Sequence, residues 1–536
     1  MEHVLRRPVE SRRAYRHRRR TLALGIILAL GITLALAVLL VGCGSVASSS
    51  GSATTPPPAV APSAAPLSTN DVQNIVQAAA QAADSASMVI AVVDRGGSVL
   101  AVYRKPGAAT TAVGNFGGLV NINDLAVGLA RTAAYFSNDQ APLSSRTVRF
   151  ISGIHFPPGV TNASNAPLYG IENTNRGCTL ATNFLPGQSV QPSLALDGTF
   201  GPGIITGKAD LLDSDPNAVN AGGVPIFRSG VVVGGVGVAG VSSDTAEYAG
   251  YVAATSNGFG PTPAAPGVVF INGIALPFVN QTSVPSGVTP GTFTGTFLVG
   301  PLASAGQPPE GDLIAPSAGP IGGLSVADVQ GILNSAETTA NQTRAVIRLP
   351  IGSRAKMVIA VADRDGTIIG LRRMTDSTVF SIDVAVTKAR NMVYFNSALR
   401  TAADLNQVPM GTAATNRTIG FGAQPLFPPG IDGSASGPFF NLYAQDVANP
   451  CTQGFQGGPP NTNKSGIVFF PGSVGLYRNG ALVGGLGVSG DGVDQDDYVA
   501  AGGALGFEAP TQIKADQIVI DAVRLTYQKF PENPTE

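Results

Sequence analysis

Residues 88–97 read MVIAVVDRGG, and residues 357–366 read MVIAVADRDG. An uninterrupted apolar run of this length predicts a strand that is buried on both faces. The Gly-Gly or Asp-Gly pair at its end supplies the positive φ of a tight hairpin turn, which predicts return strands over 98–104 and 367–373. Because the same strand and turn occur twice, the chain is predicted to contain two tandem copies of one fold.

The similarity between the two copies extends on both sides of these strands. LSTNDVQ at 67–73 corresponds to LSVADVQ at 324–330, and in each a Ser three residues before an Asp predicts the start of a helix. Downstream, each copy repeats a second helix (124–136 and 383–395), a second hairpin (224–238 and 474–488) and a closing strand (268–278 and 517–527).

Helices combined with one antiparallel sheet define an α+β fold, so two tandem domains of this class are expected. The copies are expected at 67–300 and 324–536, with a Gly/Pro-rich linker over 301–323 and an extra segment near 341–356 in the second copy only. Tandem copies commonly pack as a pseudo-symmetric pair that mimics a homodimer, and we expect that arrangement here.

The N-terminus has the pattern of a secretory signal over residues 1–42, in which a run rich in arginine precedes an uncharged apolar run. Leu40-Val-Gly-Cys43 resembles a bacterial lipobox, which predicts a lipid on Cys43, while the alternative is an uncleaved anchor. The small and polar residues of 43–66 predict a tether. We therefore expect an extracytoplasmic protein, lipid-anchored to a bacterial membrane and facing the periplasm or the cell surface. Arginine pairs leave the Sec and twin-arginine export routes both open.

Composition and histidine count exclude several functions. A net charge of −1 with 12% charged residues gives no basic surface for nucleic acid. Of three histidines, His3 and His17 lie in the signal, so His155 alone remains in the exported part. A Ser-His-Asp triad in both copies and a multi-His zinc site are therefore excluded. We predict no catalytic residue and no metal site.

Two glycine-rich strings and one acidic cluster each admit two interpretations. GxGxxG occurs at 235–240 and 485–490, but on the second strand of a hairpin rather than at the start of a βαβ unit. Close approach of another backbone is therefore favoured over nucleotide binding. Four acids at 491–497 favour capping of the following helix, with calcium as the alternative.

Charged residues and cysteines recur at matching positions of the two copies. Arg104 and Arg373 each end a strand near the next helix, where they could bind an anionic group or form a salt bridge. Cys178 and Cys451 lie in corresponding loops, and either a disulfide between the copies or two free thiols is compatible with the sequence.

Residues 357–366, 372–374, 381–389 (SIDVAVTKA) and 480–490 (GALVGGLGVSG) resemble the GlcG/HbpS-like family, known as haem-degrading or haem-binding. The resemblance implies profilin-like domains, homo-oligomers, and haem or a related small molecule as ligand or cofactor. The ligand-binding residues predicted here are Arg104, Arg373, Asp124, Asp383 and Lys388. Asp124 and Asp383 also sit at helix starts, where their role could be structural instead. Haem iron usually takes a His, Cys, Met or Tyr ligand. The candidates of these types are His155, Tyr135, Tyr394, Met374 and Met392.

Three functions follow from these expectations. The first is a binding protein that holds haem or a related small anionic ligand and is attached to a membrane by its N-terminal lipid. The second is an enzyme that degrades haem or acts on another small molecule. The third is a structural protein of envelope assembly.

Overall fold

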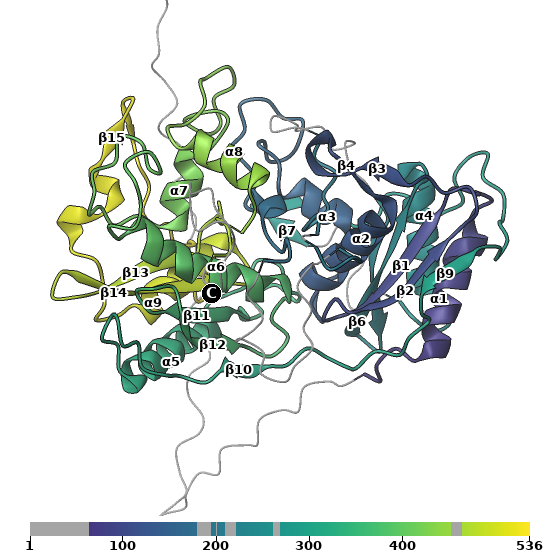
Figure 1. Ribbon diagram of the computed structural model, residues 1–536, viewed down its shortest axis with the longest axis horizontal. Coiled ribbons are helices and arrows are strands. Elements are labelled where there is room, and N and C mark those ends of the chain that lie inside the picture. Colours follow the sequence, from purple (N-terminus) through teal and green to yellow (C-terminus); the bar gives the residue numbers. More distant parts are fainter. Residues whose placement is uncertain (1–63, 179–194, 200, 210–220, 261–268, 452–463) are drawn as a thin grey trace, which may run out of the picture. The chain divides into compact units, whose positions relative to one another are not determined.

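The computed structural model describes residues 64–178, 195–199, 201–209, 221–260, 269–451 and 464–536 (Figure 1). The predicted signal over 1–42, Cys43 and the tether as far as residue 63 lie outside the described residues. Among the residues that are described, no helix is both long enough and apolar enough to cross a bilayer.

The first copy is built on a five-stranded antiparallel sheet in the order β5-β6-β1-β2-β9. Its register places Val89 opposite Arg104 of β2 on one side and opposite Ala239 of β6 on the other. The strands are β1 (Val89–Asp94), β2 (Val99–Arg104), β5 (Gly223–Arg228), β6 (Val231–Ala239) and β9 (Thr296–Val299).

Helices cover both faces of this sheet. Strand β1 is buried throughout, and its side chains alternate between two apolar cores. Ile90 and Val92 pack in the core that contains α1 (Thr69–Ala82) and α4 (Ser243–Thr255). Val89, Ala91 and Val93 instead share the core of α2 (Ile122–Phe136). The continuous apolar run therefore arises because each successive side chain has a helix to pack against.

The second copy repeats this arrangement with the sheet order β10-β12-β11-β14-β13. Apart from the closing strands, the predicted strands, hairpins and paired helices are confirmed in both copies. The elements of the second copy are α5 (Val326–Gln342), β11 (Val358–Ala362), β12 (Ile368–Arg373), α6 (Phe380–Phe395), β13 (Ser473–Arg478), β14 (Ala481–Ser489) and α9 (Val493–Gly503). The α+β fold of two tandem profilin-like domains is therefore the fold of this chain.

The segment between the copies contributes to the second sheet. Strand β10 (Gly311–Ile314) falls within 301–323, the stretch expected to be a linker, and pairs with β12. The expected closing strands differ from the sequence-based prediction. They form separate two-stranded hairpins outside the main sheets, and each arm is only two residues long. These hairpins are β7 (Phe270–Ile271) with β8 (Ile274–Ala275), and β15 (Val519–Ile520) with β16 (Val523–Arg524).

The glycine-rich strings bring a strand and a helix backbone together. A Cβ atom at Gly237 of β6 would lie 2.1 Å from the carbonyl oxygen of Ala126 in α2. In the second copy a Cβ at Gly487 of β14 would lie 2.1 Å from the carbonyl oxygen of Ala385 in α6. The predicted close approach of another backbone is confirmed, and the backbone in question is that of the helix on the sheet.

The remaining short elements lie in and around the longer inserts of each copy. They are β3 (Thr111–Val113), η1 (Asn115–Gly117), β4 (Leu119–Asn121), α3 (Ser145–Phe150), η2 (Ile171–Asn173), α7 (Asn416–Gly422), α8 (Phe440–Ala448), η3 (Thr511–Ile513) and η4 (Ala515–Gln517). One apolar core contains residues of both copies, among them Phe136 of α2 and Phe380 of α6. The two sheets are thus joined through the helices α2 and α6.

Candidate functional site

A pocket of about 770 Å³ lies where the two copies meet. Binding sites for small molecules commonly have volumes of about 300–1,000 Å³. The first copy contributes the end of α2, the loop 164–168 and the β7–β8 hairpin. The second copy contributes residues 344–349, the start of α6, part of α7, the turn from β14 into α9, and the C-terminal residues 529–532.

Aromatic side chains form much of the pocket wall. Phe136 and Phe380 stack face to face, with ring centroids 4.0 Å apart and planes 7° from parallel. The phenylalanines that line the pocket are Phe136, Phe270, Phe380, Phe421, Phe469, Phe470 and Phe530. The stacked faces of Phe136 and Phe380 are buried, whereas Phe270 and Phe530 are exposed. The exposed rings could stack on a flat apolar ligand, since aromatic faces stack well on one another.

The extra segment of the second copy forms one side of the pocket. Val346 and Ile347 line the pocket, and the amide of Val346 donates to the carbonyl oxygen of Asp491 at 2.9 Å. Arg348, whose side chain is fully buried, forms ion pairs with Asp491 and, at 2.6 Å, with Asp376. These contacts fix the inserted segment against the turn that begins α9. The first copy has no matching segment in its sequence, so the pocket is asymmetric.

Cations and acids alternate along the wall near α9. Arg417 pairs with Asp494 at 2.5 Å and with Asp497 at 2.6 Å, and Lys529 pairs with Asp494 at 3.0 Å. Each acid of the 491–497 cluster is thus paired with a cation, Asp491 with Arg348 and Asp496 with Lys388. These ion pairs occupy the carboxylates that the calcium interpretation would need. In the described ranges no group of three or more His, Cys, Asp or Glu side chains is placed to hold a metal ion.

Lys388 lies behind the pocket wall and holds Asp496, which lines it. The Lys388 ammonium is 3.0 Å from Asp496 Oδ2, donates to the Val488 carbonyl at 2.7 Å and lies 4.9 Å from the centre of the Phe470 ring. Burial raises the pKa of Asp496 to about 7, against the opposing effect of Lys388. Burial also lowers the pKa of Lys388, which Asp496 partly offsets. Both groups are thus pushed toward their neutral forms.

The two arginines predicted to bind an anion lie outside this pocket. Arg373 is buried at the end of β12 and donates to the carbonyl oxygens of Ser377, Pro308 and Pro309, at 2.6–3.1 Å. Arg104 donates to the carbonyl oxygen of Ala109 at 2.9 Å. In this structure both guanidinium groups tie a strand end to the loop that follows or covers it.

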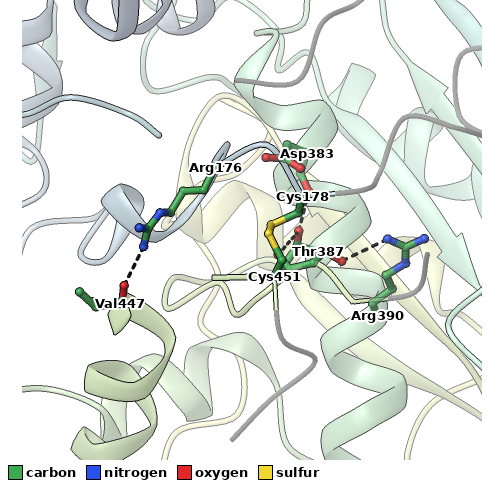
Figure 2. Close-up of a disulfide and its surroundings, with 8 residues drawn as sticks. Arg176, Cys178, Asp383, Thr387, Arg390, Val447 and Cys451 are labelled. Carbon is green, nitrogen blue, oxygen red and sulfur yellow. Dashed lines mark hydrogen bonds between the residues drawn. A yellow bond between two sulfur atoms is a disulfide. The ribbon is translucent and has the colours of Figure 1, made fainter. Parts of the chain in front are cut away.

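Asp124 and Asp383 also lie outside the pocket, in the first turns of α2 and α6. Asp124 accepts the amide of Leu196 at 2.9 Å. Figure 2 shows Asp383 beside Cys178, with Thr387 and Arg390 further along the same helix. Burial raises the pKa of Asp383 to about 7, although the Asn175 amide and Arg390 lower it.

Cys178 and Cys451 form a disulfide with their Cα atoms 5.2 Å apart (Figure 2). The bond joins residues 273 positions apart, one in each copy. Of the two alternatives compatible with the sequence, the structure has the disulfide. It is a covalent link between the copies, in addition to their shared apolar core.

The five candidate haem ligands are held elsewhere in the described part of the chain, away from the pocket lining. His155 Nε2 is 2.6 Å from Asp432 Oδ1, and the Tyr394 hydroxyl donates to Asp404 Oδ2 at 2.8 Å. The Met374 sulfur accepts from the Met357 amide at 3.3 Å. The remaining two, Tyr135 and Met392, are buried in the cores.

The sequence-based prediction therefore missed most of this site. The phenylalanines of its wall belong to apolar stretches that also suit a core, so their pattern is no guide to a pocket. One signal was present, because the extra segment near 341–356 breaks the similarity between the copies. That segment is the part of the site that an internal comparison of the repeats could have found.

Fold and pocket together define a duplicated α+β protein with a pocket at the junction of its copies. The chain belongs to the family described as haem degrading protein HbpS-like, whose model matches residues 67–251 and 324–504. It is similar to the solved PduOC:haem complex, with 22% identity over 35% of this chain and 97% of that one, at a TM-score of 0.23. It is also similar to Klebsiella pneumoniae protein ORFY, with 20% identity over 34% of this chain and 88% of that one, at a TM-score of 0.22. No curated protein matched its sequence.

Proposed function

We propose that the protein binds haem, or a closely related tetrapyrrole with carboxylate groups, in the pocket between its two copies. The observation that carries the proposal is the aromatic pocket of about 770 Å³, in a chain of a family described by its action on haem. The flat faces of such a ligand would contact Phe270 and Phe530, the phenylalanines of the lining that are most exposed. Transfer of these faces out of water would supply most of the binding free energy.

Two cations suit the carboxylates of the ligand. The Lys529 side chain is 69% exposed, so it can turn from Asp494 toward a ligand. The Arg344 guanidinium donates to the carbonyl oxygens of Glu532 and Asn533, at 2.8 and 3.1 Å. A ligand carboxylate would give it a charged acceptor instead, which makes a stronger hydrogen bond.

A haemin titration tests the proposal. The full chain is held in lipid nanodiscs, and empty nanodiscs serve as the blank for haemin that partitions into lipid. We expect a saturable shift of the Soret band. The double variant Arg344→Glu/Lys529→Glu should bind haemin about tenfold more weakly or worse, since two charge-assisted contacts are lost. Arg364→Glu makes the same kind of change at an exposed hairpin position away from the pocket and should leave the affinity unchanged.

Haem degradation is the second candidate, favoured by the description of the family. The same nanodisc sample separates the two functions when a reductant and oxygen are added after haemin has bound. A binding protein keeps its Soret band, whereas a degrading enzyme loses the band and releases iron. If haemin causes no saturable change at all, the proposal is wrong and a role in envelope assembly becomes the better hypothesis.

We also propose that the protein acts outside the cytoplasm, attached to a bacterial membrane by a lipid on Cys43. The basic and apolar runs before Cys43 and the tether sequence after it support this proposal. The Cys43→Ser variant should then appear without the lipid and uncleaved when its intact mass is measured. A wild-type chain that still carries residues 1–42 would instead indicate an uncleaved anchor.

A further inference from the structure

The lining of the pocket contains none of the side chains that usually bind haem iron. Iron takes His, Cys, Met or Tyr in most haem proteins. The pocket residues within the described ranges include no side chain of these four types. The internal ranges that the structure leaves out, 179–194, 200, 210–220, 261–268 and 452–463, contain no His, Cys, Met or Tyr either. Beyond residue 63, every side chain of these types therefore belongs to the described part.

The two cysteines and the five candidate iron ligands among those side chains are held in other contacts. Both cysteines of this part are joined in the disulfide. His155 is 7% exposed and bonded to Asp432, and the candidate tyrosines and methionines are buried in the cores. An iron ion in the pocket could reach these five candidates only if they left those contacts. Tyr498 is half-buried and packs on the pocket residue Phe530, with ring centroids 5.5 Å apart, although it does not itself line the pocket.

The carboxylates on the wall are poor substitutes as iron ligands. Asp496 is held by Lys388, at 3.0 Å, and Asp494 by Arg417, at 2.5 Å. Binding a ferric ion would break these pairs and leave buried or half-buried cations without partners, which is strongly unfavourable. The pocket thus fits the organic part of haem, its flat faces and its carboxylates, and does not fit the metal.

We infer that this pocket recognises the porphyrin macrocycle and its carboxylates rather than the iron, so that its ligand class includes metal-free porphyrins. The inference rests on the proposed function and narrows it. With no contribution from iron, metal-free protoporphyrin and haemin should bind within about threefold of each other, because both present the same faces and the same two carboxylates. Esterification of the carboxylates should weaken binding by about tenfold or more, because the charged contacts are lost.

The experiment titrates the full chain in nanodiscs with metal-free protoporphyrin, its dimethyl ester and haemin, with porphyrin fluorescence or Soret absorbance as the readout. Haemin should displace the metal-free porphyrin competitively, which places both in one site. If haemin binds and metal-free protoporphyrin binds more than about thirtyfold more weakly, iron recognition is required and the inference is overturned while the proposed function stands. If neither compound binds, the proposed function itself fails.

Two variants test directly whether a candidate side chain binds the iron, and they leave the residues that line the pocket unchanged. His155→Gln and Tyr394→Phe each remove a candidate iron ligand, and neither residue lines the pocket among the described residues. We expect both variants to keep the affinity and the absorption spectrum of bound haemin. A variant that loses haemin while it still binds metal-free porphyrin would identify an iron ligand and overturn the inference. The porphyrin titration also reports whether that variant is folded.

Discussion

Phe136, the last residue of α2, stacks on Phe380, the first residue of α6, with ring centroids 4.0 Å apart. One ring comes from each copy, and both line the pocket. The contact that joins the copies thus also lies at the pocket proposed to bind the ligand. Stability and ligand binding should therefore respond together when it is changed.

Phe380→Ala should lower the free energy of unfolding by about 3–5 kcal/mol, since it leaves a cavity and removes the stacked pair. Phe530→Ala provides the comparison, because Phe530 also lines the pocket but is 47% exposed. It should weaken haemin binding with a loss of stability below about 1 kcal/mol. Urea unfolding followed by circular dichroism, together with haemin titration, measures both effects. Equal losses of stability in the two variants would contradict the stacking argument.

Reduction of the disulfide should destabilise the protein without unfolding it at room temperature. The bond closes a loop of 273 residues, and loops of this kind restrict the unfolded chain by about 2–5 kcal/mol. Denaturant unfolding of the wild type with and without reductant should show this difference. Cys451→Ser should behave as the reduced protein does and should not respond to reductant. If reductant changed the stability of Cys451→Ser, the effect of reductant on the wild type would not arise from this disulfide.

The buried Asp446 should make a contribution to stability that is lost as the pH rises from about 4 to 8. Burial raises the pKa of Asp446 to about 8, although Arg176 and Asn173 oppose the shift. An unfolded Asp has a pKa of about 3.9, so between these values the folded state binds more protons than the unfolded state and unfolding becomes easier as pH increases. The Asp446 contribution is at most about 1.4 kcal/mol per pH unit. Asp446→Asn should flatten the dependence as far as pH 8, and Asp383→Asn only as far as about pH 7. Urea unfolding at pH 5, 7 and 8 checks this.

Two glycine-to-alanine substitutions should have opposite effects on the stability of the protein. Gly487→Ala places a methyl group 2.1 Å from the Ala385 carbonyl oxygen, so α6 must move off the sheet, at a cost of about 3 kcal/mol or more. Gly331 lies in α5 with open space around its added Cβ, and Gly331→Ala should stabilise by about 0.5–1 kcal/mol because alanine favours a helix. Melting temperatures of the two variants test the prediction. A mild effect of Gly487→Ala would mean that helix and strand are less tightly packed.

The buried arginine of the second copy should matter for stability rather than for the ligand. Arg373→Ala would leave carbonyl groups of Ser377, Pro308 and Pro309 without donors, which should cost about 3 kcal/mol or more. Arg104→Ala, at a partly exposed position, should cost less. Neither variant should change haemin affinity while it is folded. If a folded variant lost affinity for haemin, we would instead conclude that the arginine contacts the ligand.

The fold could be predicted from the sequence because its signals are local. The apolar run at 88–93 requires a strand covered on both faces, and the following Gly-Gly fixes the turn within a few residues. Strands β9 and β10 were not predicted, since each has only four residues and half of their side chains face solvent. Nothing in so short a segment distinguishes an edge strand from a loop.

The site could not be predicted in the same way, because it exists only where distant segments meet. Phe136 and Phe380 are 244 positions apart and end or begin helices whose apolar faces are indistinguishable from core. Arg348 and Asp491 pair across 143 positions. The sequence gives the type and charge of each of these residues. Which residue each of them contacts depends on how the two copies pack.

Strand β10 has a consequence for how this chain can be divided. The repeated sequence begins again at Leu324, and the family match resumes there, yet the second sheet takes its edge from residues 311–314. A second copy cut at the start of the repeat would expose the backbone of β12, and bare strand edges recruit other chains. The repeat and the family match thus begin at residue 324, whereas the second sheet is complete only when the chain begins before Gly311.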